Sequence, residues 1–148
     1  MIINDIREHL STYISNGVFS YGRAFDTALA SADIEIDEWF IHLDPITERG
    51  KLNESTLLYD VGIGFLKQDK PDSSYDEAEN MDIDPSIETI QKEAYVKAKA
   101  WLGDFLDNYP YSDGDFNITP VTRIKNVMSG CFLKVIIVTG KQIGRAHV

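Results

Sequence analysis

The chain has 148 residues, enough for one domain with a substantial hydrophobic core. Its 43% hydrophobic and 26% charged residues are ordinary for a soluble globular protein, and no apolar run is long enough to span a bilayer. The net charge of −10 argues against a basic face that grips nucleic acid, and the single cysteine excludes an intramolecular disulfide and a cysteine zinc cluster.

Apolar residues at helical spacing predict an N-terminal helix of roughly three turns. They are Ile3, Ile6, Leu10, Tyr13 and Ile14. The pair Asn16-Gly17 suits a positive φ angle and predicts the end of this helix. The following residues are mixed: Tyr21-Gly22 indicates a turn, and residues 25–30 a short helix.

Alternation of apolar and polar residues predicts an antiparallel hairpin in the next part of the chain. The apolar positions are Ile34, Ile36, Trp39, Ile41 and Leu43 in the first strand and Leu57, Tyr59, Val61, Ile63 and Phe65 in the second. The polar residues 44–55 predict a long loop or arm between the two strands. Gly62 and Gly64 share the other face of the second strand, which indicates a bulge or the close approach of another surface.

The strongest helical signal lies in the second half of the chain, after an acidic stretch. Residues 68–84 carry many carboxylates and no apolar periodicity, so they are predicted to form an exposed connector. Asp84 as N-cap, Pro85 at the first helical position and Pro110 as a stop signal predict a helix from Pro85 to Asn108. Its apolar stripe consists of Ile87, Ile90, Ala94, Ala98, Trp101 and Phe105.

Two further strands are predicted beyond this helix. Residues 111–114 suggest a turn, residues 116–128 and 132–138 suggest strands, and Ser129-Gly130 suggests a tight turn between them. The predicted fold class is therefore α+β: an N-terminal helix and an antiparallel, mostly four-stranded sheet, with the long central helix packed on one face. The predicted order of elements is helix, strand, strand, helix, strand, strand.

We expect residues 1–142 to form a single α+β domain. Residues 143–148, Ile-Gly-Arg-Ala-His-Val, resemble the in-frame translation of a widely used short-read sequencing adapter. We therefore expect residues 143–148 to be a non-native C-terminal tail, the alternative being a genuine short polar tail.

Candidate ligand-binding motifs fail on their spacing. The acidic connector lacks the glycine and the terminal glutamate of an EF-hand loop. Gly140-Lys141 resembles the end of a phosphate-binding loop, but Val135 stands where that motif needs glycine. We therefore expect no cofactor and no cofactor-binding or metal-binding residues.

Single reactive side chains also have simpler structural explanations. His9 and His42 lie on different predicted elements, and His42 is expected at the surface or at an interface. Asp104 and Asp107 fit a solvated helix face, with no histidine nearby in sequence. Cys131 is expected to be a small, semi-buried hydrophobic residue, since no base is identified that would activate it. We expect no catalytic residues, and the chain is predicted not to be an enzyme.

Several predicted strands have apolar side chains on both faces. Phe40 lies opposite Trp39, Leu58 and Leu66 lie opposite Tyr59 and Phe65, and Phe132 and Ile136 lie opposite Leu133, Val135 and Ile137. One long helix and one terminal helix can cover only one side of such a sheet. The other side is therefore expected to be an apolar patch that another subunit covers.

In its length and order of elements the chain resembles the tail terminator (tail completion) and head–tail neck proteins of long-tailed bacteriophages. The resemblance is carried by Phe40-Ile41-His42-Leu43 before the loop, residues 57–67 after it, Pro71-Asp72, the long helix, and the last strand at residues 129–138. These are patterns of hydrophobicity and length rather than an invariant signature.

This resemblance implies a structural virion protein at the tail or head–tail junction, assembled in the host cytoplasm. Such proteins form a homo-oligomeric ring, usually of six subunits, that caps the tail tube and meets the head-completion or neck protein. DNA would pass through the lumen without specific binding, which suits an acidic ring, and no membrane is involved. Residues 44–55 and 68–84 would reach neighbours or the tube.

Two other classes of function remain open from the sequence. A small cytoplasmic oligomeric binding or regulatory module could bury the same face of the sheet in a dimer. A small hydrolase is disfavoured, because no nucleophile–base pair is recognisable.

Overall fold

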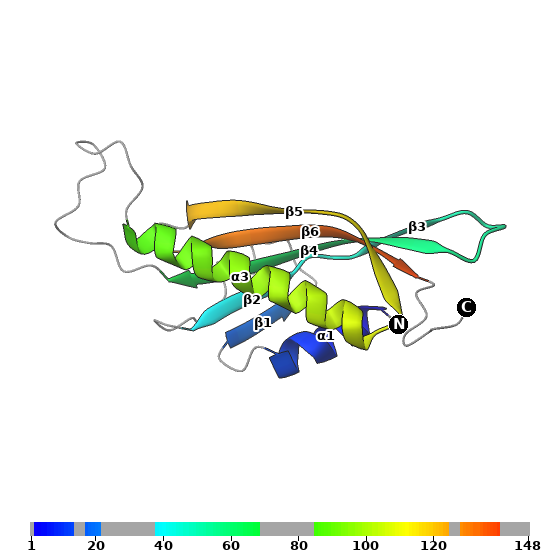
Figure 1. Ribbon diagram of the computed structural model, residues 1–148, viewed down its shortest axis with the longest axis horizontal. Coiled ribbons are helices and arrows are strands. Elements are labelled where there is room, and N and C mark those ends of the chain that lie inside the picture. The colour runs from blue at the N-terminus through cyan, green and yellow to red at the C-terminus, as the bar shows by residue number, and fades with distance from the viewer. Residues whose placement is uncertain (1, 14–16, 22–37, 69–84, 125–127, 140–148) are drawn as a thin grey trace.

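The computed structural model describes residues 2–13, 17–21, 38–68, 85–124 and 128–139. In these residues the fold is α+β, with helices α1 and α3 and an open six-stranded sheet. The strand order is β1-β2-β4-β6-β5, with β3 also paired to β4 (Figure 1). The predicted class is confirmed, but the prediction of four antiparallel strands was wrong, because the described sheet has six and β1 runs parallel to β2.

The two helices match the sequence prediction to different degrees. α3 spans Pro85–Asn108, the residues predicted from its apolar stripe and from the flanking prolines. α1 spans Ile2–Tyr13, and Gly17, which was expected to end this helix, is instead the first residue of β1. α3 lies across one face of the sheet, and α1 packs beside its C-terminal half (Figure 1).

Several strands extend further than the alternation of apolar residues suggested, and Met128, predicted at the end of one strand, is the first residue of the next. They are β1 (Gly17–Tyr21), β2 (Trp39–Leu43), β3 (Thr47–Gly50), β4 (Leu57–Gln68), β5 (Tyr111–Ile124) and β6 (Met128–Thr139). β3 lies within the predicted loop, and the predicted turn at residues 111–114 belongs to β5. Both segments are rich in polar residues, so backbone pairing with β4 and β6 determines their conformation.

The predicted tight turn at Ser129-Gly130 is also wrong, since both residues pair with neighbouring strands inside β6. Gly130 has a φ angle of 156°, and a Cβ atom there would collide with the carbonyl oxygen of Phe65 in β4. The glycine is therefore required by the close approach of two strand backbones.

A β-bulge joins β2 and β3 along the same edge of β4. Leu43 pairs with Ile63 and Thr47 pairs with Asp60, so residues 44–46 lie opposite only residues 61 and 62. This extra residue reverses which side chains face the helix, because side chains alternate along a strand. Trp39, Ile41 and Leu43 are core residues before the bulge, and Ile46 packs on the core after it.

The hydrophobic core lies between α3 and the face of the sheet that we call the inner face. α1 and α3 contribute Ile6, Leu10, Ala94, Ala98, Trp101 and Phe105, and the strands contribute Ile41, Leu43, Val61, Ile63, Phe65, Leu133, Val135 and Ile137. The inner-face residues predicted from alternation in β2, β4 and β6 are confirmed as core, apart from Leu57 and Tyr59, which are only partly buried.

Some predictions concern residues outside the described ranges. These are the short helix at 25–30, the strand residues Ile34 and Ile36, the acidic connector beyond Gln68, the N-cap Asp84, and Gly140, Lys141 and the C-terminal tail.

Candidate subunit interface

The outer face of the sheet, opposite α3, differs between its two ends. At one end Phe40, His42 and Leu66 are completely buried within the single chain, as is Met128 nearby. At the other end Leu58, Phe132, Ile136 and Val138 are only partly buried. The exposed apolar surface is therefore smaller than predicted, and the expectation that His42 lies at the surface or at an interface was wrong, because it is completely buried within one chain. We call the part around Phe132 and Ile136 the open end.

A hollow of about 390 Å³ lies in the open end. Its apolar lining includes Phe132 and Ile136 from β6, and Lys134 lies between them in the same strand. Three carboxylates also line it: Asp44 from the bulge, Asp60 from β4 and Asp115 from β5. The hollow thus combines an apolar surface with three acidic groups and one ammonium group.

Gly62 allows the hollow to have this shape. A Cβ atom on Gly62 would lie 2.9 Å from Cζ of Phe132 and 3.4 Å from Oδ2 of Asp44. The Phe132 ring therefore packs directly on the β4 backbone, which confirms the close approach predicted from the glycines. The Asp44 amide donates a 2.9 Å hydrogen bond to the Gly62 carbonyl, and Asp44 Oδ1 lies 3.1 Å from Nε2 of His42. These contacts fix the Asp44 carboxylate beside the hollow.

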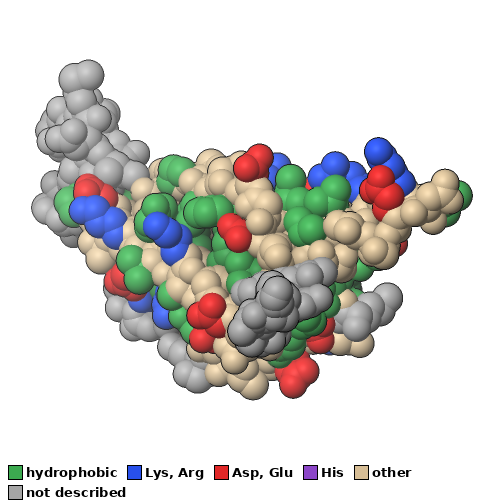
Figure 2. Space-filling model, turned by 45° about the vertical axis from the view of Figure 1, so that its right-hand side comes forward, with side chains coloured by type: hydrophobic (Ala, Val, Ile, Leu, Met, Phe, Trp, Pro, Cys, Tyr) green, Lys and Arg blue, Asp and Glu red, His purple; other side chains and the backbone are tan. Residues whose placement is uncertain are grey.

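The predicted loop forms a hairpin arm, residues 47–60, that projects from the sheet (Figure 1). The Arg49 guanidinium donates two 3.0 Å hydrogen bonds to the Asp60 carboxylate across the two strands. At the end of the paired strands nearest the tip, the Leu57 amide donates a 2.9 Å hydrogen bond to the Thr139 hydroxyl of β6. Lys/Arg and Asp/Glu side chains gather along the projecting arm (Figure 2).

The tip of the arm presents an unusual side chain. Leu52 is fully exposed, more so than any other large hydrophobic residue of the described chain. Lys51 beside it is also exposed and lies 3.9 Å from Glu54. The tip therefore carries an apolar side chain next to a cation and contributes nothing to the core.

The free edge of the sheet at β5 is poorly suited to pairing with another chain. Pro120 lacks an amide donor, and register shifts occur between Asp113 and Phe116 and between Val121 and Ile124. The exposed carboxylates Asp113 and Asp115 lie in the same strand. Proline, bulges and charges are the features by which edge strands avoid association. The β5 edge is therefore a poor candidate for association through strand pairing.

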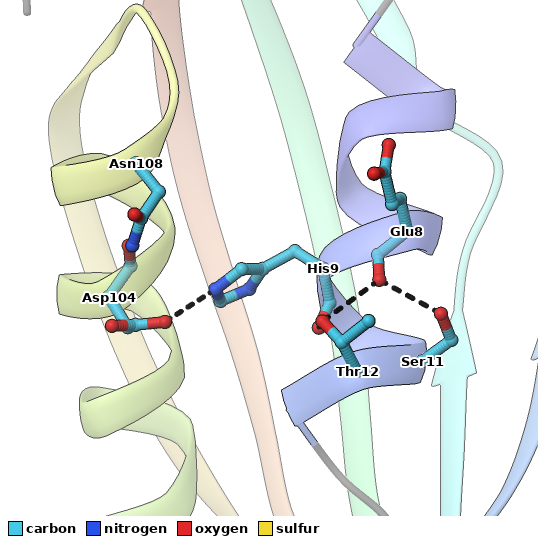
Figure 3. Close-up of polar contacts among 6 residues, drawn as sticks. All are labelled: Glu8, His9, Ser11, Thr12, Asp104 and Asn108. Atoms are coloured by element: carbon cyan, nitrogen blue, oxygen red, sulfur yellow. Dashed lines mark hydrogen bonds and ion pairs between the residues drawn. The ribbon is translucent and has the colours of Figure 1, made fainter.

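A second polar cluster joins α1 to α3. His9 Nε2 lies 2.6 Å from Asp104 Oδ2, and the imidazole points from α1 toward the carboxylate (Figure 3). The ring is buried among Tyr13, Trp101, Phe105 and Tyr109, which lie within 6 Å by ring centroids, whereas Asp104 is about half exposed. The sequence prediction of a solvated Asp104 with no histidine nearby missed this contact. The two residues are 95 positions apart, so no local pattern could reveal it.

Two further buried groups have raised pKa values. Burial, followed by the hydrogen bond that its hydroxyl donates to Asp5, raises the pKa of Tyr111 above the usual range, and this 2.7 Å bond joins β5 to α1. Burial raises the pKa of the Cys131 thiol to about 12. Cys131 is almost completely buried, deeper than the predicted semi-buried position, and its thiol stays protonated at neutral pH.

The described residues bring no three His, Cys, Asp or Glu side chains together as a metal ion would require. His9, His42 and Cys131 lie on α1, β2 and β6, respectively. Within the described ranges neither helix is both long and apolar enough to cross a membrane. The sequence matches no protein-family model and no curated protein.

Proposed function

We propose that this chain is a structural virion protein of a tailed bacteriophage: a ring-forming tail terminator or neck component. In this role identical copies close into a ring, which the family resemblance puts at six subunits. The ring caps the tail tube and joins it to the head-completion or neck protein, so the work of the chain is assembly rather than catalysis.

The observation that carries the proposal is the unequal covering of the two sheet faces. α3 and α1 bury the inner face, whereas the open end keeps Phe132 and Ile136 partly exposed beside a hollow. The arm projects beyond this surface and places an apolar side chain at its tip. A chain with a receptive surface and a projecting arm suits repeated association with copies of itself.

The charge supports the same role. A ring built from chains with a net charge of −10 repels the phosphates of DNA that passes through its lumen, so DNA moves without being trapped.

The proposal is tested by mixing the purified chain with isolated phage tail tubes and viewing them by negative-stain electron microscopy. We expect rings in solution and a ring at one end of each tube. A closed dimer that leaves the tubes bare would contradict the proposal and favour a small cytoplasmic binding or regulatory module.

A further inference from the structure

We propose that the tip of the arm, Lys51-Leu52, docks into the hollow at the open end of a second copy of the chain. This inference rests on the proposed function for its biological setting, but it concerns a contact that can be measured on the purified chain alone.

The tip presents an apolar side chain that can become buried on association. Leu52 is fully exposed, and an exposed leucine side chain gains free energy when it moves from water into an apolar site. Leu52 makes no contribution to the core of its own chain, so the whole of this gain is available for association. Pairing of β3 with β4 holds the arm in shape before it binds, which lowers the entropy that docking would cost.

The hollow is complementary to the tip. Phe132 and Ile136 provide an apolar surface for the leucine side chain. Asp60 is already paired with Arg49, but Asp44 and Asp115 still outnumber Lys134, so the hollow favours a cation such as Lys51 at its rim.

The tip cannot reach the hollow of its own chain. Thr47 and Asp60, at the base of the arm, line the hollow, and the paired strand from Thr47 to Gly50 holds the tip roughly 10 Å away. The tip can therefore contact a hollow only on another molecule. A second copy of the chain carries such a hollow, and it also carries a tip of its own. Each copy gives its tip to one neighbour and its hollow to the other, which is a heterologous contact that closes into a ring when the rotation per copy allows it.

Disulfide trapping tests the contact. One preparation carries Leu52→Cys and a second carries Asn117→Cys, which lines the hollow. Mixed under mild oxidation, they should give a two-chain product on a non-reducing gel. Native Cys131 is buried and adds no background. Val96→Cys, on the exposed side of α3, is the control partner for Leu52→Cys and should give at least about tenfold less product. Equal yields from the two pairs would overturn the inference.

Substitutions at the tip provide the second measurement. Leu52→Asp should raise the dissociation constant of the assembly at least about tenfold in sedimentation, with the melting temperature of the chain unchanged. Lys51→Glu should weaken assembly as well, and Asp115→Lys in the same chain should restore it by exchanging the charges. An unchanged dissociation constant for the Leu52→Asp variant would overturn the inference.

The result is separable from the test of the proposed function. Rings that cap tail tubes even with Leu52→Asp would refute tip docking and leave the virion role standing. Rings that are lost with Leu52→Asp but do not bind tail tubes would support tip docking and refute the virion role.

Discussion

Neighbouring residues on β6 show how differently the two faces of the sheet are used. Ile137 points inward and is completely buried against the helices, whereas Ile136 points outward and is only partly buried in the hollow. The two side chains are identical and adjacent, so their surroundings alone distinguish them. The inner face stabilises the fold of the single chain, whereas the open end of the outer face leaves apolar side chains partly exposed.

The largest expected effect is on the inner face. Ile137→Asp would bury an unpaired carboxylate at a cost of about 5 kcal/mol, comparable to the stability of many domains. We expect no cooperative melting transition in circular dichroism. Ile136→Asp is the matched control and should melt within a few degrees of the wild type, because its carboxylate can reach water. Similar losses from both variants would show that the outer face is as essential to folding as the inner face.

The buried end of the outer face can be tested with glycine substitutions. Gly130→Ala would force a Cβ atom onto the Phe65 carbonyl, and we expect a loss of about 3 kcal/mol in urea denaturation. Gly103→Ala is the control: no atom of another part of the chain lies within 4 Å of the added Cβ, so the stronger helix former should raise stability by about 0.5–1 kcal/mol. A neutral Gly130→Ala would contradict the close approach of β4 and β6.

The contact between the two helices should have an intermediate effect. Asp104→Ala removes the carboxylate that lies against His9 and leaves Nε2 of this buried ring without that partner, so we expect a loss of about 1–3 kcal/mol in urea denaturation. Asp104→Asn keeps an acceptor oxygen and should lose less. If Asn and Ala variants were equally stable, the contact would not contribute through its hydrogen bond.

The smallest effect is expected on the arm. Arg49→Ala should cost only about 0.2–1 kcal/mol, because both members of its pair with Asp60 are about half exposed. Lys51→Ala, at the tip, is the control and should leave the free energy of unfolding unchanged. A loss larger than about 2 kcal/mol for Arg49→Ala in urea denaturation would mean that the ion pair, rather than strand pairing, holds the arm in shape.

Local sequence signals were sufficient for the elements that bury an apolar stripe. α3 was predicted to the residue because its stripe is long and Pro85 and Pro110 bound it, and β4 and the second half of β6 follow a clear alternation. The exposed strand β3 and the short β1 carry no such alternation, and they are strands because neighbouring backbones pair with them.

The candidate interface was predicted only in outline. Apolar residues on both faces correctly indicated an outer surface around Phe132 and Ile136, but the pattern could not show that Phe40 and Leu66 are already buried within the chain. The hollow depends on the bulge at residues 44–46, which brings Asp44 beside β6. Such a shift in register depends on tertiary pairing and leaves little local signal in the sequence.

Static light scattering of the wild-type chain across a wide range of concentrations tests most directly whether the open end is an interface between copies. We expect a particle of fixed mass several times the 16.7 kDa of one chain, six times for a hexameric ring, and a single-chain mass for Ile136→Asp. A wild-type mass of 16.7 kDa at every concentration would show that the open end is an ordinary solvent-facing surface.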